Sequence, residues 1–155
     1  MSEPVSEPVS APLPVPGLDD DPVTRPFWGA VEQGRLLLEG CSGCRAVIWY
    51  PRGFCPRCGS TATDWIEASG RGTVYSYTVA RKSFGAFAPL TPYVIAYIEL
   101  AEGPRILSNV VGVRPEEVAI GLPVELVIEK PEGSPAVYRF RPATGELPGG
   151  GGKRQ

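Results

Sequence analysis

Cys41-Ser42-Gly43-Cys44 is followed, after ten intervening residues, by Cys55-Pro56-Arg57-Cys58-Gly59, and these two CxxC pairs are the strongest chemical signal in the chain. Two residues between cysteines let one tight turn point both sulfurs at the same ion, and two such turns complete a tetrahedron around zinc. Gly59 permits a positive φ that turns backbone N–H groups toward sulfur, whereas Arg45 stands at the equivalent place after the first pair. The spacing predicts a structural zinc ion with four ligands: Cys41, Cys44, Cys55 and Cys58.

A four-thiolate zinc site has no open position for water or substrate, so catalysis at the metal is not expected. We expect the ion to close a module of about 30 residues that could not bury a core without it, with Trp49 and Trp65 packed around it. Iron in a rubredoxin-like site, a redox dithiol and unmetallated cysteines are the alternatives. The chain has no histidine, which excludes Ser-His-Asp and Cys-His nucleophiles and a histidine general base.

Charge is unevenly distributed along the 155 residues, which carry 15 Lys and Arg against 17 Asp and Glu. Five of the acids lie within residues 1 to 21, which hold no basic residue, so the remainder has a formal charge of +3. Four thiolates and one zinc ion would lower that value to about +1. A nearly neutral body does not suit a protein that binds nucleic-acid backbones by bulk electrostatics.

The composition divides the chain into four parts. Residues 1–25 form an acidic, proline-rich tail and residues 143–155 a glycine-rich one, and both are predicted to be disordered. Residues 26–67 hold a short helix and the zinc ribbon, and residues 68–142 hold a β-barrel. The sequence shows no signal peptide and no apolar run near the length of about 20 residues that spans a membrane, so we expect a cytoplasmic protein.

The fold class is predicted to be mainly β. Pro26 to Gly34 has the pattern of a short helix with Phe27, Ala30 and Val31 on one face. Arg35 to Glu39 is the expected first strand, and Gly70-Arg71-Gly72 the expected site of a bulge at the start of the barrel. Five strands with one helical turn after the third suit a five-stranded OB-type barrel. The five are Thr73 to Ala80, Tyr93 to Leu100, Arg105 to Val111, Val124 to Lys130 and Val137 to Arg141.

Two further groups of residues are candidates for binding. Arg81 and Lys82, beside Phe84 in a loop rich in Gly and Pro, could cradle a phosphate and stack an adenine, or could be a solvated strand end. Phe27 and Trp28 could belong to the core or could anchor a partner protein. No catalytic residue is predicted.

Several segments, in their order and spacing along the chain, resemble the DUF35 family, whose members join a rubredoxin-like zinc ribbon to an OB-fold. The resemblance covers roughly residues 26 to 142. It rests on Pro26-Phe27-Trp28, the four cysteines, Gly72 to Val79, Pro92-Tyr93-Val94, Glu99 to Arg105 and Gly121-Leu122-Pro123-Val124.

That resemblance implies a non-catalytic accessory subunit in acyl-CoA metabolism. Family members associate in hetero-oligomers with thiolase-fold enzymes, including thiolases, sterol-carrier-type thiolases and retro-aldolases, and some with MaoC-like hydratases. The resemblance makes the four cysteines zinc ligands, Phe27 and Trp28 partner contacts, and Arg81, Lys82 and Phe84 contacts to the CoA thioester of the partner's substrate. It implies that the barrel helps to form the acyl-CoA channel.

Two rival functions stay open. Zinc ribbons and OB-folds also bind single-stranded nucleic acid, and Tyr75, Tyr77, Tyr93 and Tyr97 could stack bases, although the nearly neutral body argues against this alternative. An iron-loaded ribbon would instead carry electrons.

Overall fold

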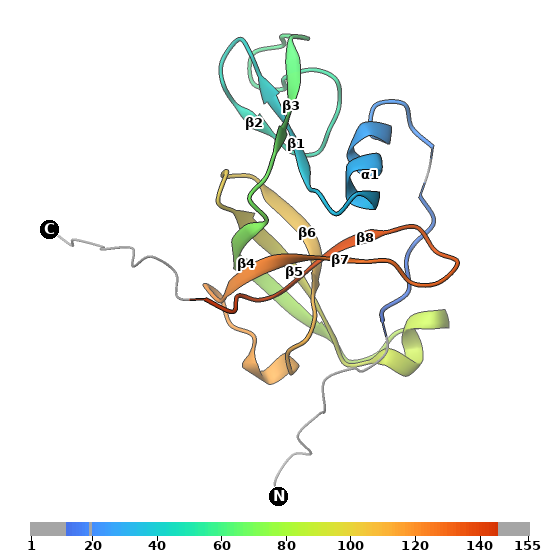
Figure 1. Cartoon of the computed structure of the whole chain (residues 1–155). Coiled ribbons are helices and arrows are strands. Elements are labelled where there is room, and N and C mark those ends of the chain that lie inside the picture. The colour runs from blue at the N-terminus through green and yellow to red at the C-terminus, as the bar shows by residue number, and fades with distance from the viewer. Residues whose placement is uncertain (1–11, 19, 146–155) are drawn as a thin grey trace, which may run out of the picture.

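A three-stranded sheet is followed along the chain by a five-stranded barrel, and one helix lies beside both (Figure 1). The structure is a computed structural model that describes residues 12–18 and 20–145. Most of the two predicted tails, residues 1–11 and 146–155, lies outside the described residues. Within the described part the fold class is mainly β, as the sequence predicts.

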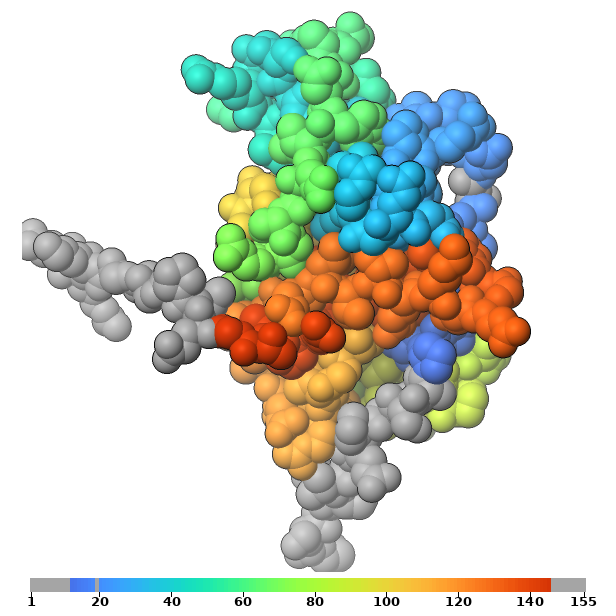
Figure 2. All heavy atoms as spheres, viewed as in Figure 1, coloured from blue at the N-terminus to red at the C-terminus, as the bar shows by residue number. Residues whose placement is uncertain are grey.

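Helix α1 (Arg25–Glu32) carries a proline at its first turn and buries Phe27, Ala30 and Val31, so the predicted apolar face is confirmed. The Glu32 carboxylate accepts hydrogen bonds from the Ala136 backbone N–H at 2.7 Å and from the Lys130 ammonium group. These contacts attach the end of the helix to the loop between the last two barrel strands. Figure 2 shows α1 seated directly on the surface of those strands.

The first sheet has the order β2-β1-β3, with β1 (Leu37–Cys41) between β2 (Val47–Ile48) and β3 (Thr63–Glu67). Both pairings are antiparallel. Strand β1 begins two residues later than predicted and runs up to the first cysteine. The strand therefore delivers Cys41 directly to the metal centre.

The barrel is closed in the order β4-β5-β6-β8-β7, which is the predicted OB-type architecture. Its five strands agree with the predicted segments to within two residues. The 3₁₀ turn after the third strand is the predicted helical turn, whereas the 3₁₀ helix between the first two strands was not predicted. A parallel bridge between Val110 and Phe140 joins β6 to β8, and this seam is the shortest pairing of the barrel. The elements are β4 (Arg71–Ala80), η1 (Gly85–Leu90), β5 (Tyr93–Leu100), β6 (Arg105–Val110), η2 (Pro115–Glu117), β7 (Pro123–Glu129) and β8 (Val137–Pro142).

One hydrophobic core extends from the barrel through α1 into the three-stranded sheet. Phe27 lies at this junction, with its ring centroid 5.0 Å from that of Trp28, 5.1 Å from Trp49 and 5.7 Å from Tyr138. Trp49 and Trp65 both pack against this core and not against the smaller cluster around the cysteines. The expectation that these tryptophans surround the metal is wrong, because the rings fill the junction between ribbon and barrel.

Some of the described residues of the predicted N-terminal tail are buried in the fold. Leu13 is only 4% exposed, and Thr24 is also buried. Residues 21–24 form a turn in which the Thr24 and Arg25 N–H groups donate to the Asp21 carbonyl. The composition did not predict the burial of Leu13, because a proline-rich segment with few apolar residues can still pack against the fold through one leucine.

Among the described residues, none of the helices has the length and hydropathy needed to cross a bilayer.

Candidate metal centre

The four cysteine sulfurs converge on one point. The Cys41 and Cys58 sulfurs are 3.6 Å apart, as are those of Cys44 and Cys55, and all four lie within 4.8 Å of one another. A tetrahedral zinc ion with Zn–S bonds of about 2.3 Å requires sulfurs about 3.8 Å apart. The cluster therefore has the size and the donor set of a four-thiolate metal site, and its geometry confirms that the four cysteines act together.

The two turns that carry the cysteines are nearly equivalent. After the first pair, Arg45 donates its backbone N–H to the Cys41 carbonyl at 2.9 Å, and after the second, Gly59 donates to Cys55 at 2.8 Å. Arg45 and Gly59 both have a positive φ, of 59° and 76°. The arginine therefore adopts the conformation that the sequence predicts only for the glycine, and both halves of the site close in the same way.

Electrostatics inside the cluster disfavour four thiolates in the absence of a cation. The backbone N–H of Cys44, 3.4 Å from the Cys41 sulfur, lowers the pKa of Cys41 to about 6. At Cys58 the Ser60 backbone N–H acts in the same direction, but the neighbouring sulfurs of Cys41 and Cys44 raise the pKa to about 11. The first thiolate thus forms easily and the last does not. A divalent ion between the sulfurs removes this repulsion and holds all four as thiolates.

Glu39 supports the second cysteine pair from inside the ribbon. Its buried carboxylate accepts hydrogen bonds from the Arg52 N–H at 2.9 Å, the Gly53 N–H at 3.3 Å and the Thr63 hydroxyl at 3.4 Å. These bonds fix the loop that leads to Cys55. Sequence reasoning missed Glu39, although an acid within the buried stretch from Leu36 to Cys41 is the signal that could have revealed it.

Arg81, Lys82 and Phe84 lie together on the surface after β4, at the end of the barrel remote from the ribbon (Figure 1). Phe84 is 94% exposed. Within the described part of the chain, neither Arg81 nor Lys82 forms an ion pair. The three side chains are free to meet a ligand, and their assignment to CoA stays a prediction.

Phe27 and Trp28 have different surroundings. Phe27 has no exposed surface with which to meet a partner, so we assign it to the core. Trp28 is half-buried and stacks on Tyr138 with ring centroids 5.8 Å apart. Its role as a partner contact stays a prediction.

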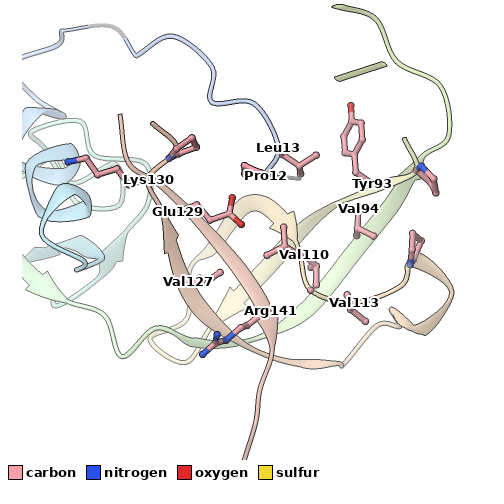
Figure 3. A pocket seen from close by; sticks show the side chains of 15 residues that line it. Pro12, Leu13, Tyr93, Val94, Val110, Val113, Val127, Glu129, Lys130 and Arg141 are labelled. Carbon is pink, nitrogen blue, oxygen red and sulfur yellow. The ribbon is translucent and has the colours of Figure 1, made fainter. Parts of the chain in front are cut away.

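Two cavities flank the short seam between β6 and β8. The larger, about 510 Å³, opens at the end of the barrel between Leu13, Val94, Val110 and Val127 (Figure 3). The smaller, about 290 Å³, lies on the outside of the seam. It is lined by the aromatic residues Trp28, Phe87, Tyr93 and Tyr138 together with Pro14 and Pro16. Neither cavity is evident from the sequence.

Comparison with known proteins places these features in a family. A family model described as the rubredoxin-like zinc ribbon domain of ChsH2 matches residues 28–64, and one described as the C-terminal OB-fold domain of ChsH2 matches residues 65–129. The matched residues include all four cysteines and the first four barrel strands. The four cysteines are therefore the metal site of a rubredoxin-like zinc ribbon.

Two curated relatives are 38% identical to the chain. One, from Methanocaldococcus jannaschii, is named "DUF35 domain-containing scaffold protein"; the match covers 81% of this chain and 94% of the relative. The other, from Thermomonospora curvata, is named "Probable enoyl-CoA hydratase alpha subunit". That match covers 92% of this chain but only 44% of the relative, so the chain spans less than half the length of that protein.

Two solved structures share the fold. The "Ltp2-ChsH2(DUF35) aldolase" is 36% identical with a TM-score of 0.73, covering 83% of this chain and 98% of the matched one. A DUF35 protein from Sulfolobus solfataricus, at 19% identity and a TM-score of 0.60, covers 80% of this chain and 85% of its own and supports the fold alone. With its ribbon, its barrel and these relatives, the chain belongs to the DUF35 family.

Proposed function

We propose that this protein is a non-catalytic subunit that docks on a thiolase-fold enzyme acting on acyl-CoA, stabilises it and helps to form its acyl-CoA channel. The observation that carries the proposal is the closed metal site. Four sulfurs would fill every position of a tetrahedral zinc ion, so a bound ion would organise the fold and leave no position for substrate. Relatives named scaffold protein, and a neighbour that forms part of an aldolase, support a role in an assembly.

We propose the outer face of β5 and β6 as the docking surface. Tyr97 and Leu107 are directly paired across these strands and are 46% and 49% exposed. Tyr75 of the neighbouring strand is exposed beside them, and the Arg105 guanidinium lies 3.6 Å from the centre of its ring. Adjacent exposed aromatic and aliphatic side chains with an arginine are typical of the energetic centre of a protein interface.

We propose the loop after β4 as the CoA side of the complex. CoA carries phosphate groups, which Arg81 and Lys82 would pair with, and an adenine ring, which Phe84 would stack against. Both interactions need exposed side chains without competing ion pairs. Arg81, Lys82 and Phe84 are exposed, and among the described residues neither base forms an ion pair, which supports the proposal.

Co-purification with a thiolase-fold enzyme from the same organism, co-expressed with this protein, tests the docking. Leu107→Asp should abolish co-purification, whereas Ile120→Asp, which places the same charge at an exposed site on the loop before β7, should leave it intact. The proposal fails if the catalytic subunit alone is soluble, monodisperse and fully active.

Steady-state kinetics of the complex test the CoA contact separately. The double variant Arg81→Ala/Lys82→Ala should raise KM for the acyl-CoA several-fold with docking retained. Arg57→Ala, in the exposed turn of the ribbon, is the control for loss of a surface charge and should leave KM unchanged. An unchanged KM in the double variant would exclude this loop from the CoA site while leaving the docking proposal in place.

A further inference from the structure

Residues 12–16, Pro12-Leu13-Pro14-Val15-Pro16, form a strap that crosses the seam between β6 and β8. Proline at every second position fixes φ at about −65° and biases each preceding residue toward extended backbone, so the strap is preorganised as an extended peptide. Its prolines have no N–H to donate. Such a segment offers carbonyl oxygens in excess, and these oxygens need donors from the surface on which it lies.

Arg139 of β8 supplies those donors. Its Nη2 group donates to the Leu13 carbonyl at 2.9 Å and to the Pro14 carbonyl at 3.2 Å. The same guanidinium donates through Nη1 to the Asn109 side-chain oxygen and through Nε to Glu129 at 2.6 Å. Arg139 is 2% exposed. Its position is therefore fixed by groups of β6 and β7, and both N–H bonds of Nη2 are directed at the strap.

The strap side chains enter both cavities of the seam. Leu13 is buried at the mouth of the barrel among Val94, Val110 and Val127, where Figure 3 shows it beside Pro12. Pro14 and Pro16 line the outer groove with Trp28, Tyr93 and Tyr138. Aromatic grooves whose donors bind backbone carbonyls are a general means of recognising proline-rich peptides, because the peptide loses little conformational entropy on binding.

We propose that the Arg139 seam is a recognition site for an extended peptide with alternating prolines, and that residues 12–16 of this chain occupy it in cis. The site adjoins the surfaces proposed above, because Leu107 and Phe87 also line its outer groove. Its tests measure protection of the seam and peptide binding, not co-purification or KM, so it can fail separately from those proposals. A bound strap covers the barrel mouth and the Trp28 groove. Its release makes both surfaces accessible to a partner.

Hydrogen exchange on the full-length protein tests the cis contact. Leu13→Asp places a charge in the barrel mouth and should release the strap, so amides of residues 107–111 and 137–141 should exchange at least about tenfold faster, the scale expected from loss of a buried leucine. Val23→Asp is the matched control, because Val23 is exposed and lies in the same N-terminal region. Unchanged exchange in Leu13→Asp would overturn the proposal.

A synthetic peptide with the sequence of residues 10–18 tests recognition directly. Added to the Leu13→Asp protein, it should bind saturably, change the tryptophan fluorescence and restore the lost protection. A peptide with the Leu13→Asp change should do neither. Wild-type protein should bind the peptide at least about tenfold more weakly, because the tethered strap competes at high effective concentration. Failure of the peptide to bind the strap-released protein would overturn the proposal.

If Leu13→Asp does not fold, the variant Pro12→Gly/Pro14→Gly/Pro16→Gly keeps Leu13 and removes only the preorganisation. It should increase exchange at the seam and bind the peptide better than wild type does. A triple variant with wild-type exchange and wild-type peptide binding would show that the prolines are not recognised.

Discussion

Arg45 and Gly59 follow the two cysteine pairs at equivalent positions and share a left-handed backbone, with φ of 59° and 76°. Each residue closes its turn by donating its N–H to the carbonyl of the first cysteine of the pair. A left-handed conformation costs a residue with a side chain roughly 1–2 kcal/mol, and glycine avoids this cost. The two halves of the metal centre have the same geometry, but the first half contains strain that the second does not.

We predict opposite effects of substitution at these two positions. Arg45→Gly should raise the free energy of unfolding by about 1 kcal/mol, and Gly59→Ala should lower it by about 1–2 kcal/mol. A Cβ added at Gly59 meets nothing within 4 Å, so backbone strain is the whole effect. Denaturant unfolding of the zinc-loaded protein measures both values. Equal changes of the same sign would contradict the argument.

Gly72 is predicted to be intolerant of any side chain. It pairs with Leu100 on one side and Val124 on the other, and a Cβ would lie 2.6 Å from the Glu99 carbonyl oxygen and 2.8 Å from an Ile98 methyl group. Gly72→Ala should therefore cost about 1–3 kcal/mol in unfolding free energy, since backbone must move.

Gly29 provides the contrasting case. It lies on the exposed side of α1 with nothing within 4 Å of an added Cβ. Gly29→Ala should stabilise the protein by up to about 1 kcal/mol through helix propensity.

A Gly72→Ala protein as stable as wild type would contradict the prediction for Gly72. It would show that β4 and β5 can separate at Gly72.

Gly72 also shows what the sequence could and could not predict. Its place between strand-forming residues predicts β4, but the sequence assigned the Gly-Arg-Gly segment to a bulge, and the register shift instead lies between Val74 and Ser76. Periodicity locates a strand because it depends on neighbours in the chain. A close approach of two strands depends on residues about 27 positions apart, such as Gly72 and Glu99, and leaves no local pattern.

The same reason explains why the metal site could be predicted from the sequence and the seam between β6 and β8 could not. Four cysteines at fixed spacing reveal the metal ligands, because both turns are local. Arg139 is one arginine in an alternating strand, and its partners at residues 13, 14, 109 and 129 come from three other segments. Phe27 and Trp28 are likewise ambiguous in the sequence, since an aromatic side chain looks the same in a core as at an interface.

Loss of the metal is predicted to unfold the ribbon and to leave the barrel folded. Cys41 and Cys55 belong to a small cluster separate from the main core. Metal binding supplies most of the folding free energy in such modules, about 10–16 kcal/mol in zinc-finger peptides. Cys55→Ser should abolish metal binding and expose residues 41–60 to proteolysis, while β4 to β8 stay protected from hydrogen exchange.

Elemental analysis should find one zinc ion per wild-type chain and none in Cys55→Ser. Ser42→Ala, inside the first turn but not a ligand, is the control and should keep its zinc. Iron with visible absorption would identify an electron-transfer site. Full loss of barrel protection in Cys55→Ser would show that ribbon and barrel fold as one unit.

Tyr138 is predicted to make stability fall at alkaline pH. Burial raises the pKa of its phenol above the ordinary value, with a smaller contribution from the charge of nearby Tyr50. The folded state therefore keeps the phenol neutral at pH values where the unfolded chain ionises it. A raised pKa contributes its full stability below the unfolded value of about 10 and loses it as the pH rises further, at up to about 1.4 kcal/mol per pH unit.

Tyr138→Phe preserves the ring contacts with Phe27 and Trp28 and should remove this slope between pH 10 and 11. Tyr97→Phe, at an exposed ring, should behave as wild type does. Urea unfolding of the zinc-loaded proteins from pH 8 to 11 measures the three slopes. Parallel curves for Tyr138→Phe and wild type would mean that the phenol ionises without opening the junction between ribbon and barrel.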